Sequence, residues 1–461
     1  MLCFFLMQWL LLLQLLKPYF SDASRYLFEF SIICVRSFIA DTFLYDILTP
    51  LFYISNIGIV MIEIINSGGV TSAQGFSAGA TYAGLKTQSD TLDLGVILSE
   101  SMANVAATFT TNSIESPSVS VSRKRLLSGT ALGVVANSGC ANCSVGEQGF
   151  ADAEEMTELA AGFLGGTSDD YFVASTGMIG VELPMALIRQ NLNNISLDSN
   201  GGSDFAKSIM TTDTKSKERA VSFMFEGKTI TVGGAAKGVG MIHPNMATML
   251  CFITTDADVE QAFLQECLSE AVSSSFNMID VDGDQSTNDM VLVLANGSSN
   301  TSKIDKKSDA APMLIESLQY VCVELAKELV RDGEGAQRLI EVTVEGAVDL
   351  TEARTAARSI ASSLLVKSMV HGGDPNWGRI VMALGKSGIS IIENSIDIYI
   401  NSIHIVHNGT AIPYFSDAVI SAMAEETVEF KVSLSNGQFS ATAWGCDLTE
   451  EYVVFNSAYS T

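Results

Sequence analysis

The chain has 461 residues, of which 47% are hydrophobic and 17% charged, a composition that is typical of globular proteins and excludes an intrinsically disordered chain. Its 52 acidic and 26 basic residues give a formal net charge of -26, and such a surface repels phosphate backbones, which excludes nucleic acid as a partner. Because a single core seldom grows beyond roughly 250 to 300 residues, we expect two structural halves.

The first 66 residues differ in composition from the rest of the chain. Residues 2–16 are almost wholly apolar, and a further apolar stretch covers residues 32–65. The first run is shorter than the roughly 18 to 20 residues that span a bilayer, and no basic segment precedes it as in a signal peptide. We expect residues 1–66 to be either a removable leader or a wrongly assigned start.

From Gly68 onward, short β-branched runs alternate with longer amphipathic stretches. These runs predict strands at 94–98, 132–135, 171–174, 221–225, 229–232, 248–254, 290–294 and 339–344, and a strand-rich tail at 389–392, 396–400, 428–434 and 452–455. Helical periodicity predicts helices at 153–163, 184–193, 259–273, 310–330 and 350–369. Acidic residues between 256 and 260 are expected to mark a helix N-terminus just after the strand at 248–254. The pattern predicts an α/β (α+β) fold with layered sheets and helices.

One pentapeptide, Gly75-Phe76-Ser77-Ala78-Gly79, matches the GxSxG pattern of the nucleophile elbow in serine hydrolases. A true elbow follows a buried strand, but residues 68–74 have no strand pattern. We therefore interpret this motif as a Gly-rich loop.

Three further patterns resemble ligand sites and are better interpreted as structural. Residues 233–240 contain Lys-Gly where a P-loop requires Gly-Lys-Ser/Thr. Residues 280–284 alternate acids as a calcium loop does, but Gln285 stands where an EF-hand needs glycine, so a tight turn is expected. Cys140 and Cys143 form a lone CxxC without a second pair, and the eight scattered cysteines fit a reducing compartment better than a disulfide framework.

The most informative stretch is residues 237–250, in which a Gly-rich approach, Pro244 and the small Ala247 precede Thr248 at the start of an apolar strand. Self-cleavage at such a bond requires the threonine hydroxyl to attack the preceding carbonyl. The freed α-amine, a group whose pKa in simple peptides is about 7.7 to 8.0, can then act as the base for its own hydroxyl. The alternative is a strand-initial threonine with a purely structural role.

At this stretch the chain resembles the ornithine acetyltransferase family, also called the bifunctional glutamate N-acetyltransferase family, whose members are cut at the position of Ala247 and Thr248. The resemblance extends from Gly68 to Thr461 and includes the segments 68–71, 109–112, 175–177, 210–214, 281–284, 332–335, 374–379 and 443–448. It implies an α chain of residues 67–247 and a β chain of residues 248–461, which are expected to pair into a heterotetramer.

The resemblance also implies a ping-pong reaction. The Thr248 hydroxyl takes acetyl from N-acetylornithine, releases ornithine and passes the acetyl to glutamate, with acetyl-CoA as an alternative first donor and with no other cofactor and no metal. Thr176 and Gly177 match the family's oxyanion pair. The positions that match its substrate-binding residues are Thr211, Lys237, Thr248, Glu334, Asn456 and Thr461.

Two other function classes remain open at this point. In an amidohydrolase with an N-terminal nucleophile, water replaces glutamate as the acceptor, and the same residues would serve. A non-enzymatic relative would remain a single uncut chain. By the same resemblance, a leader places the protein in a plastid or mitochondrion, and otherwise a cytoplasmic location is expected.

Overall fold

The computed structural model describes residues 53–55, 58–60, 62–86, 91–243 and 249–458. The chain divides into two compact units, Met1–Ile64 and Ile65–Thr461. In the first unit the described strands β1 (Tyr53–Ser55) and β2 (Gly58–Val60) pair antiparallel. None of the helices within the described ranges combines the length and apolarity needed to cross a bilayer.

The larger sheet comprises nine strands among the described residues, in the order β3-β8-β9-β10-β12-β5-β6-β7, with β4 also paired to β5. Their bounds are β3 (Glu63–Ile65), β4 (Phe76–Thr81), β5 (Leu94–Phe109), β6 (Thr130–Cys140), β7 (Tyr171–Met178), β8 (Lys217–Phe225), β9 (Lys228–Lys237), β10 (Leu250–Thr255) and β12 (Met290–Ala295). The first part of β5 pairs with β4 and β6, and its last part pairs with β12. The long strand β5 therefore passes from one layer of this sheet to the other.

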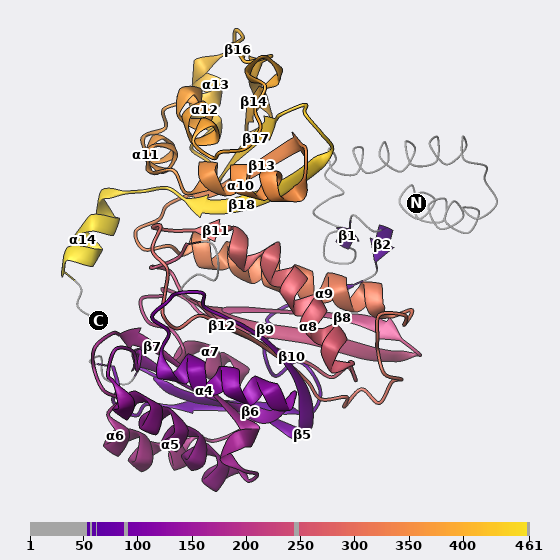
Figure 1. Cartoon of the computed structure of the whole chain (residues 1–461), viewed down its shortest axis with the longest axis vertical. Coiled ribbons are helices and arrows are strands. Elements are labelled where there is room, and N and C mark those ends of the chain that lie inside the picture. Colours follow the sequence, from indigo (N-terminus) through magenta and orange to yellow (C-terminus); the bar gives the residue numbers. More distant parts are fainter. Residues whose placement is uncertain (1–52, 56–57, 61, 87–90, 244–248, 459–461) are drawn as a thin grey trace. The chain divides into compact units, whose positions relative to one another are not determined.

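Helices cover both outer faces of these two layers (Figure 1). On one side lie α5 (Glu147–Leu164) and α6 (Met185–Asn191), and on the other lie α8 (Gln261–Ser273) and α9 (Ala311–Arg331). Helix α4 (Pro117–Arg125) lies along the edge strand β7, where the Ser122 hydroxyl hydrogen-bonds the backbone N–H and carbonyl of Val173. A short helix, α7 (Gly202–Ser208), contacts β4 and β5. The arrangement is a four-layer stack of helices, sheet, sheet and helices.

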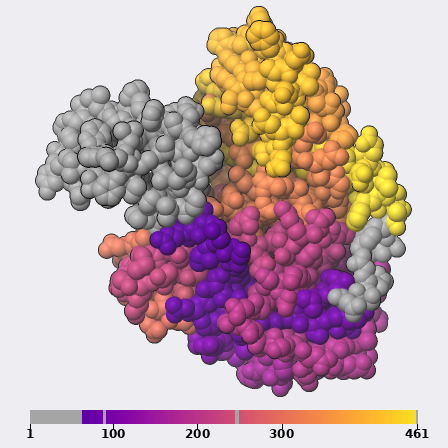
Figure 2. Space-filling model, turned by 180° about the vertical axis from the view of Figure 1, so that it is seen from behind, coloured from indigo at the N-terminus to yellow at the C-terminus, as the bar shows by residue number. Residues whose placement is uncertain are grey.

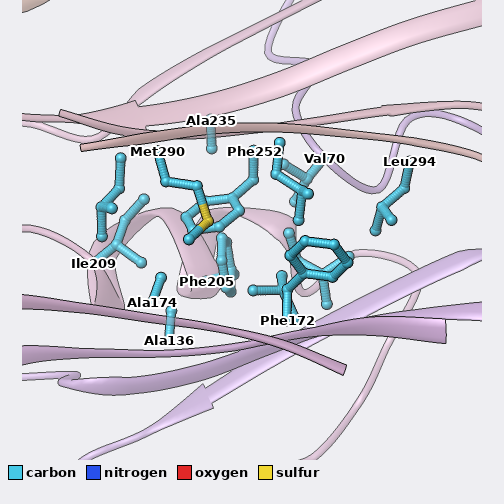
Figure 3. Packing of buried hydrophobic residues seen from close by; sticks show 14 of the residues in the cluster. Val70, Ala136, Phe172, Ala174, Phe205, Ile209, Ala235, Phe252, Met290 and Leu294 are labelled. Carbon is cyan, nitrogen blue, oxygen red and sulfur yellow. The ribbon is translucent and has the colours of Figure 1, made fainter. Parts of the chain in front are cut away.

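The main core fills the space between the two sheet layers (Figure 3). Phe172 and Ala174 of β7 point into it, whereas Tyr171 and Val173 belong to a second core against α5 and α6. Because side chains alternate along a strand, a strand buried on both faces must be apolar at every position. This explains the unbroken apolar run Tyr171–Ala174. Burial continues to Thr176, and Gly177 and Met178 at the end of β7 are half-buried.

A second sheet has seven strands among the described residues, in the order β11-β18-β13-β17-β14-β15-β16. Its strands are β11 (Ile279–Asp280), β13 (Leu339–Ala347), β14 (Asp397–Ile400), β15 (Ile403–His407), β16 (Thr410–Ala411), β17 (Thr427–Ser433) and β18 (Phe439–Cys446). Helix α10 (Leu350–Ala361) packs on β13 and β18, and α11 (Leu364–Gly372), α12 (Trp377–Gly385) and α13 (Ser416–Ala422) complete this half. The predicted fold class, with layered sheets and helices in two halves, is confirmed.

Several predicted elements are wrong in detail. The single helix expected at 350–369 is two helices, because Ser363 has an extended backbone that ends one and begins the other. Residues 389–392 form no strand. Helix α8 does begin just after β10, with Glu260 at its N-cap position, as predicted, but no acidic residue lies in its first turn. Asp256 instead accepts hydrogen bonds from the backbone N–H groups of Gln74 and Thr231.

The predicted strand at 452–455 is instead part of helix α14 (Glu450–Ala458), which stands at the edge of the second unit (Figure 1, Figure 2). Acidic residues in its first turn favour a helix start. Val453 and Val454 are 64% and 65% exposed, so no sheet neighbour buries them. β-Branched residues form a strand only where a neighbouring strand offers pairing, and this segment has none.

Candidate active site

The predicted oxyanion residues Thr176 and Gly177 lie near the end of β7, and Lys237 is the last residue of β9. The Lys237 ammonium donates a hydrogen bond of 3.2 Å to the Thr176 hydroxyl, and both side chains are buried. Since the lysine occupies an acceptor position of this hydroxyl, the hydroxyl hydrogen is free to point elsewhere. The structure thus brings together two residues that lie 61 positions apart in the sequence.

Gly177 must be glycine at this position. Its φ of +127° lies in the range that L side chains rarely adopt, and a Cβ would stand 2.3 Å from the carbonyl carbon of Gly139 on the neighbouring strand β6. The absence of a side chain at Gly177 therefore allows β6 and β7 to approach closely at this point.

A buried network of charges surrounds Lys237. Asp213 accepts hydrogen bonds from the Gly238 N–H at 2.9 Å and from the Lys217 ammonium at 2.7 Å, and Lys217 also bridges to Asp332 at 2.7 Å. Burial would raise the pKa of Asp213, but Lys217 and Lys237 beside it hold that pKa below its usual range. Burial lowers the pKa of Lys237, an effect that Lys217 reinforces and Asp213 opposes.

The remaining described substrate positions, Thr211, Glu334 and Asn456, gather on one side of this network. Thr211 donates its N–H to Asp213 at 3.1 Å. The Glu334 carboxylate accepts a hydrogen bond from the Thr212 hydroxyl at 2.7 Å and another from the Asn456 amide at 2.9 Å. This half-buried carboxylate can bind an ammonium group, and Asn456 brings helix α14 to it.

Both flanks of the predicted cleavage segment are fastened to one stretch of chain, residues 280–289. Upstream, Asp282 accepts hydrogen bonds from the N–H groups of Met241 at 2.6 Å and Ile242 at 2.9 Å. Downstream, Asp289 accepts one from the N–H of Met249 at 2.9 Å. The motif at 280–284 is a tight turn, as predicted, with Gly283 at φ +82°.

Ala247, Thr248 and Thr461 lie outside the described residues, so the structure describes neither the scissile bond nor the chain end. The predicted strand at 248–254 is present from Leu250 as β10. Leu250 pairs with Lys237 of β9 and with Met290 of β12. The strand that follows Thr248 therefore begins beside Lys237.

Three residues near this site were not predicted from the sequence. Asp213 and Asp289 lie 35 residues before and 41 residues after Thr248. Asp213 stands in the segment 210–214 that carries the family resemblance but had no role assigned to it, and Asp289 lies outside every such segment. The third is Lys86, whose pKa burial lowers to about 8 and which lies close to the charges of Lys237 and Asp213. Only a perturbed pKa at a site assembled in three dimensions identifies such groups.

The weaker motifs are structural, in agreement with their interpretation. Ser77 lies within strand β4 and pairs with Leu98, so the GxSxG motif is not a strand-to-helix elbow, and the predicted loop is a strand. Cys140 and Cys143 are buried free thiols. Among the described residues, one group could hold a metal ion, Asp397, His404 and His407 on the hairpin β14–β15, outside the candidate site.

The chain is similar to known proteins along most of its length. Residues 77–461 match the ArgJ family. The arginine biosynthesis bifunctional protein ArgJ of Dehalococcoides mccartyi (strain CBDB1) is 46% identical over 401 residues, which cover 87% of this chain and 99% of that protein. The protein of the same name from Symbiobacterium thermophilum is 45% identical over 398 residues, covering 86% of this chain and 99% of the relative.

Two solved structures are also similar. One is the arginine biosynthesis bifunctional protein ArgJ of Bacillus halodurans, with 40% identity and a TM-score of 0.45 over 45% of this chain and 98% of that one. The other is the ornithine acetyltransferase of Mycobacterium tuberculosis complexed with ornithine, with 33% identity and a TM-score of 0.37 over 40% of this chain and 98% of that one.

Proposed function

Because the chain belongs to the ArgJ family, we propose that it is a bifunctional acetyltransferase of arginine biosynthesis. It moves an acetyl group from N-acetylornithine to glutamate, and acetyl-CoA serves as the alternative first donor. No further cofactor takes part in this reaction. A removable leader would place the protein in a plastid or mitochondrion, and the protein is otherwise cytoplasmic.

The first step is self-cleavage. The Thr248 hydroxyl attacks the carbonyl carbon of Ala247, the peptide C–N bond breaks, and water hydrolyses the resulting ester to release the α chain and a free α-amine on Thr248. The α chain (67–247) and the β chain (248–461) then remain together and pair into a heterotetramer. The hydrogen bonds to Met241, Ile242 and Met249 described above support a segment held from both sides.

The second step transfers the acetyl group. The α-amine of Thr248 takes the hydroxyl proton as the oxygen attacks the acetyl carbonyl of N-acetylornithine, and the ornithine amine leaves with a proton. The neutral amine of glutamate then attacks the acetyl ester, its proton passes through the α-amine to the departing threonine oxygen, and N-acetylglutamate is released. Each attack places negative charge on the acetyl oxygen, which the Thr176 hydroxyl and the Gly177 N–H stabilise.

One observation carries this proposal more than any other. The Lys237 ammonium binds the Thr176 hydroxyl at 3.2 Å, at the place where the strand that follows Thr248 begins. A hydroxyl polarised by a buried cation is a strong donor to a developing oxyanion. Glu334 supplies a carboxylate for the ammonium of ornithine, and Thr211 and Asn456 line the same side.

Two measurements test the function. N-terminal sequencing of the two fragments of the purified protein should give a β chain that begins Thr-Met-Leu. Any other start would show that Thr248 is not the nucleophile. Incubation with N-acetylornithine should produce N-acetylglutamate and ornithine in equal amounts when glutamate is present. Acetate formation at the same rate with and without glutamate would instead identify an amidohydrolase.

Mass spectrometry of protein incubated with N-acetylornithine alone is the direct test of the ping-pong order. The β chain should gain the mass of one acetyl group, and the gain should disappear when glutamate is added. Thr248→Ala should leave one uncut chain without transferase activity, whereas Thr248→Ser keeps the hydroxyl and should cut slowly.

A further inference from the structure

Asp289 is a buried carboxylic acid that takes no part in the chemical steps described above, although its hydrogen bond to Met249 is one of the contacts that fasten the cleavage segment. It directly precedes β12, its side chain is inaccessible to solvent, and its Oδ1 accepts the Met249 N–H at 2.9 Å. The backbone carbonyl of Asp289 accepts the N–H of Thr110, which holds the residue against the end of β5. Burying a carboxyl group is costly, so its retention here calls for a specific task.

The peptide unit that Asp289 binds is the one next to the nucleophile. The Met249 nitrogen is bonded to the carbonyl carbon of Thr248, so the hydrogen bond from Asp289 acts on the peptide unit that joins the proposed nucleophile to the following strand. The Met249 carbonyl in turn accepts the N–H of Met290 at 3.1 Å. Met249 is itself 1% exposed, so water cannot replace the carboxyl as the acceptor of its N–H.

The residue before Asp289 fastens the oxyanion strand. The Asn288 amide donates to the carbonyl of Ser175 at 2.8 Å and to that of Ala141 at 2.6 Å, and Ser175 directly precedes Thr176. Two consecutive residues therefore hold the strand that bears Thr176 and the strand that follows Thr248. The rate of nucleophilic attack depends on the relative position of these two strands.

Charged groups of the buried network lie near Asp289. Lys237 lies close to the carboxylates of Asp213, Asp289 and Glu334, and Lys86 lies close to Lys237 and Asp213. Burial raises the pKa of Asp289 well above its usual range, and the Met249 N–H, Lys237 and the side chains of Ser286 and Thr110 oppose this.

We propose that Asp289 is a positioning residue for the N-terminal nucleophile: through the Met249 amide it holds the chain that leads into β10 in a fixed position relative to the strand that carries Thr176, both during self-cleavage and during acetyl transfer. This inference rests on the proposed function. It adds a residue that touches neither substrate nor reacting atoms and acts through the peptide unit beside them.

The test compares Asp289→Ala and Asp289→Asn with Asp256→Ala. Asp256 is a matched control because it is also buried, accepts two backbone N–H groups and follows the other end of the same strand, β10. The measurements are the rate of cleavage by mass spectrometry, and kcat and KM of the processed enzyme well below its melting temperature.

Asp289→Ala should slow cleavage and lower kcat by roughly 10- to 100-fold with KM nearly unchanged, since a shift of about 1 Å in a reacting group can cost 100-fold. Asp289→Asn keeps a neutral acceptor for the Met249 N–H and should restore most of both rates. Asp256→Ala should lose stability but cleave and turn over like the wild type. Wild-type cleavage and kcat in Asp289→Ala would overturn the proposal.

Two further outcomes are covered. If Asp289→Ala yields no folded protein, Asp289→Val replaces it, because valine refills most of the volume without providing an acceptor. Slower cleavage and a lower kcat would again support the proposal, and wild-type values of both would overturn it. If Asp256→Ala slows cleavage and kcat as much as Asp289→Ala, the effect is one of general stability and the positioning role is refuted. A wild-type chain that is not cut before Thr248 contradicts the proposed function itself, before any variant is compared.

Discussion

Replacing Thr176 with valine tests whether its hydroxyl stabilises charge in the reaction or only supports the fold. Valine has nearly the same shape as threonine and the same restriction at χ1, so it removes the hydroxyl with little change in packing. In the folded protein this hydroxyl accepts a hydrogen bond from Lys237 at 3.2 Å and is buried. The substitution therefore removes one donor to the oxyanion and one acceptor for a buried ammonium.

The two losses have different sizes and act on different quantities. Loss of one oxyanion donor lowers kcat by roughly 10²- to 10³-fold, or about 2.7 to 4 kcal/mol of transition-state stabilisation. Loss of a hydrogen bond to a charged group costs about 1.5 to 3 kcal/mol of folding stability. The observed 3.2 Å is long for a charge-assisted bond, which places the stability cost near the lower figure.

The assay measures kcat, KM and melting temperature on fully processed Thr176→Val and Thr176→Ser for both half-reactions. Valine should lower kcat in both half-reactions by the same factor with KM barely changed, because each passes through the same kind of oxyanion. Serine keeps the hydroxyl and should retain much more activity. If valine lowers only the melting temperature and leaves kcat of the folded enzyme intact, Thr176 has a structural role and Gly177 is left as the donor.

Three further predictions concern the charges of the site. Lys217→Met should reduce the free energy of unfolding by about 3 to 5 kcal/mol in chemical denaturation, because it leaves Asp213 and its neighbour Asp332 without their buried bridging cation; a loss below about 1 kcal/mol would show that the bridge is dispensable. Glu334→Gln should raise KM for N-acetylornithine by roughly 10- to 100-fold without slowing cleavage, since a charged hydrogen bond to the substrate ammonium is lost, and an unchanged KM in steady-state assays would remove this carboxylate from substrate binding. Folding raises the pKa of Asp289 above the unfolded value of about 3.9, so the folded state binds the proton more tightly. The contribution of Asp289 to the free energy of unfolding should therefore be complete below about pH 4 and decline as the pH rises toward the folded pKa. The stability of the wild type relative to Asp289→Asn should therefore fall with rising pH in thermal denaturation, and parallel curves would contradict the raised pKa.

The local sequence pattern was sufficient to predict a strand wherever neighbouring strands and helices bury it on both faces. The runs at 171–174 and 290–294 predicted β7 and β12 correctly, because a strand enclosed on both faces is apolar at every position. The run at 452–455 has the same residue types and is a helix, because no strand lies beside it. The residue types of a segment do not tell which segments will lie beside it in the fold. The presence or absence of a neighbouring strand is what made the first two runs strands and the third a helix.

The sequence also determined much of the candidate site. Thr176, Gly177, Lys237 and Glu334 were identified from motifs that stand at fixed places along the chain, and the structure brings their elements together. Their mutual geometry was not predictable from those motifs, because the two strands that carry Thr176 and Lys237 belong to different layers of the sheet.

Only the tertiary structure decided which other groups act on these residues. The sequence assigned no role to Asp289 or Asp213, and each becomes informative through one long-range hydrogen bond, to Met249 and to Gly238 respectively. The sequence determines that a carboxyl group is present, but whether it is ionised, and what it holds, depends on burial and on the charges that the fold places around it.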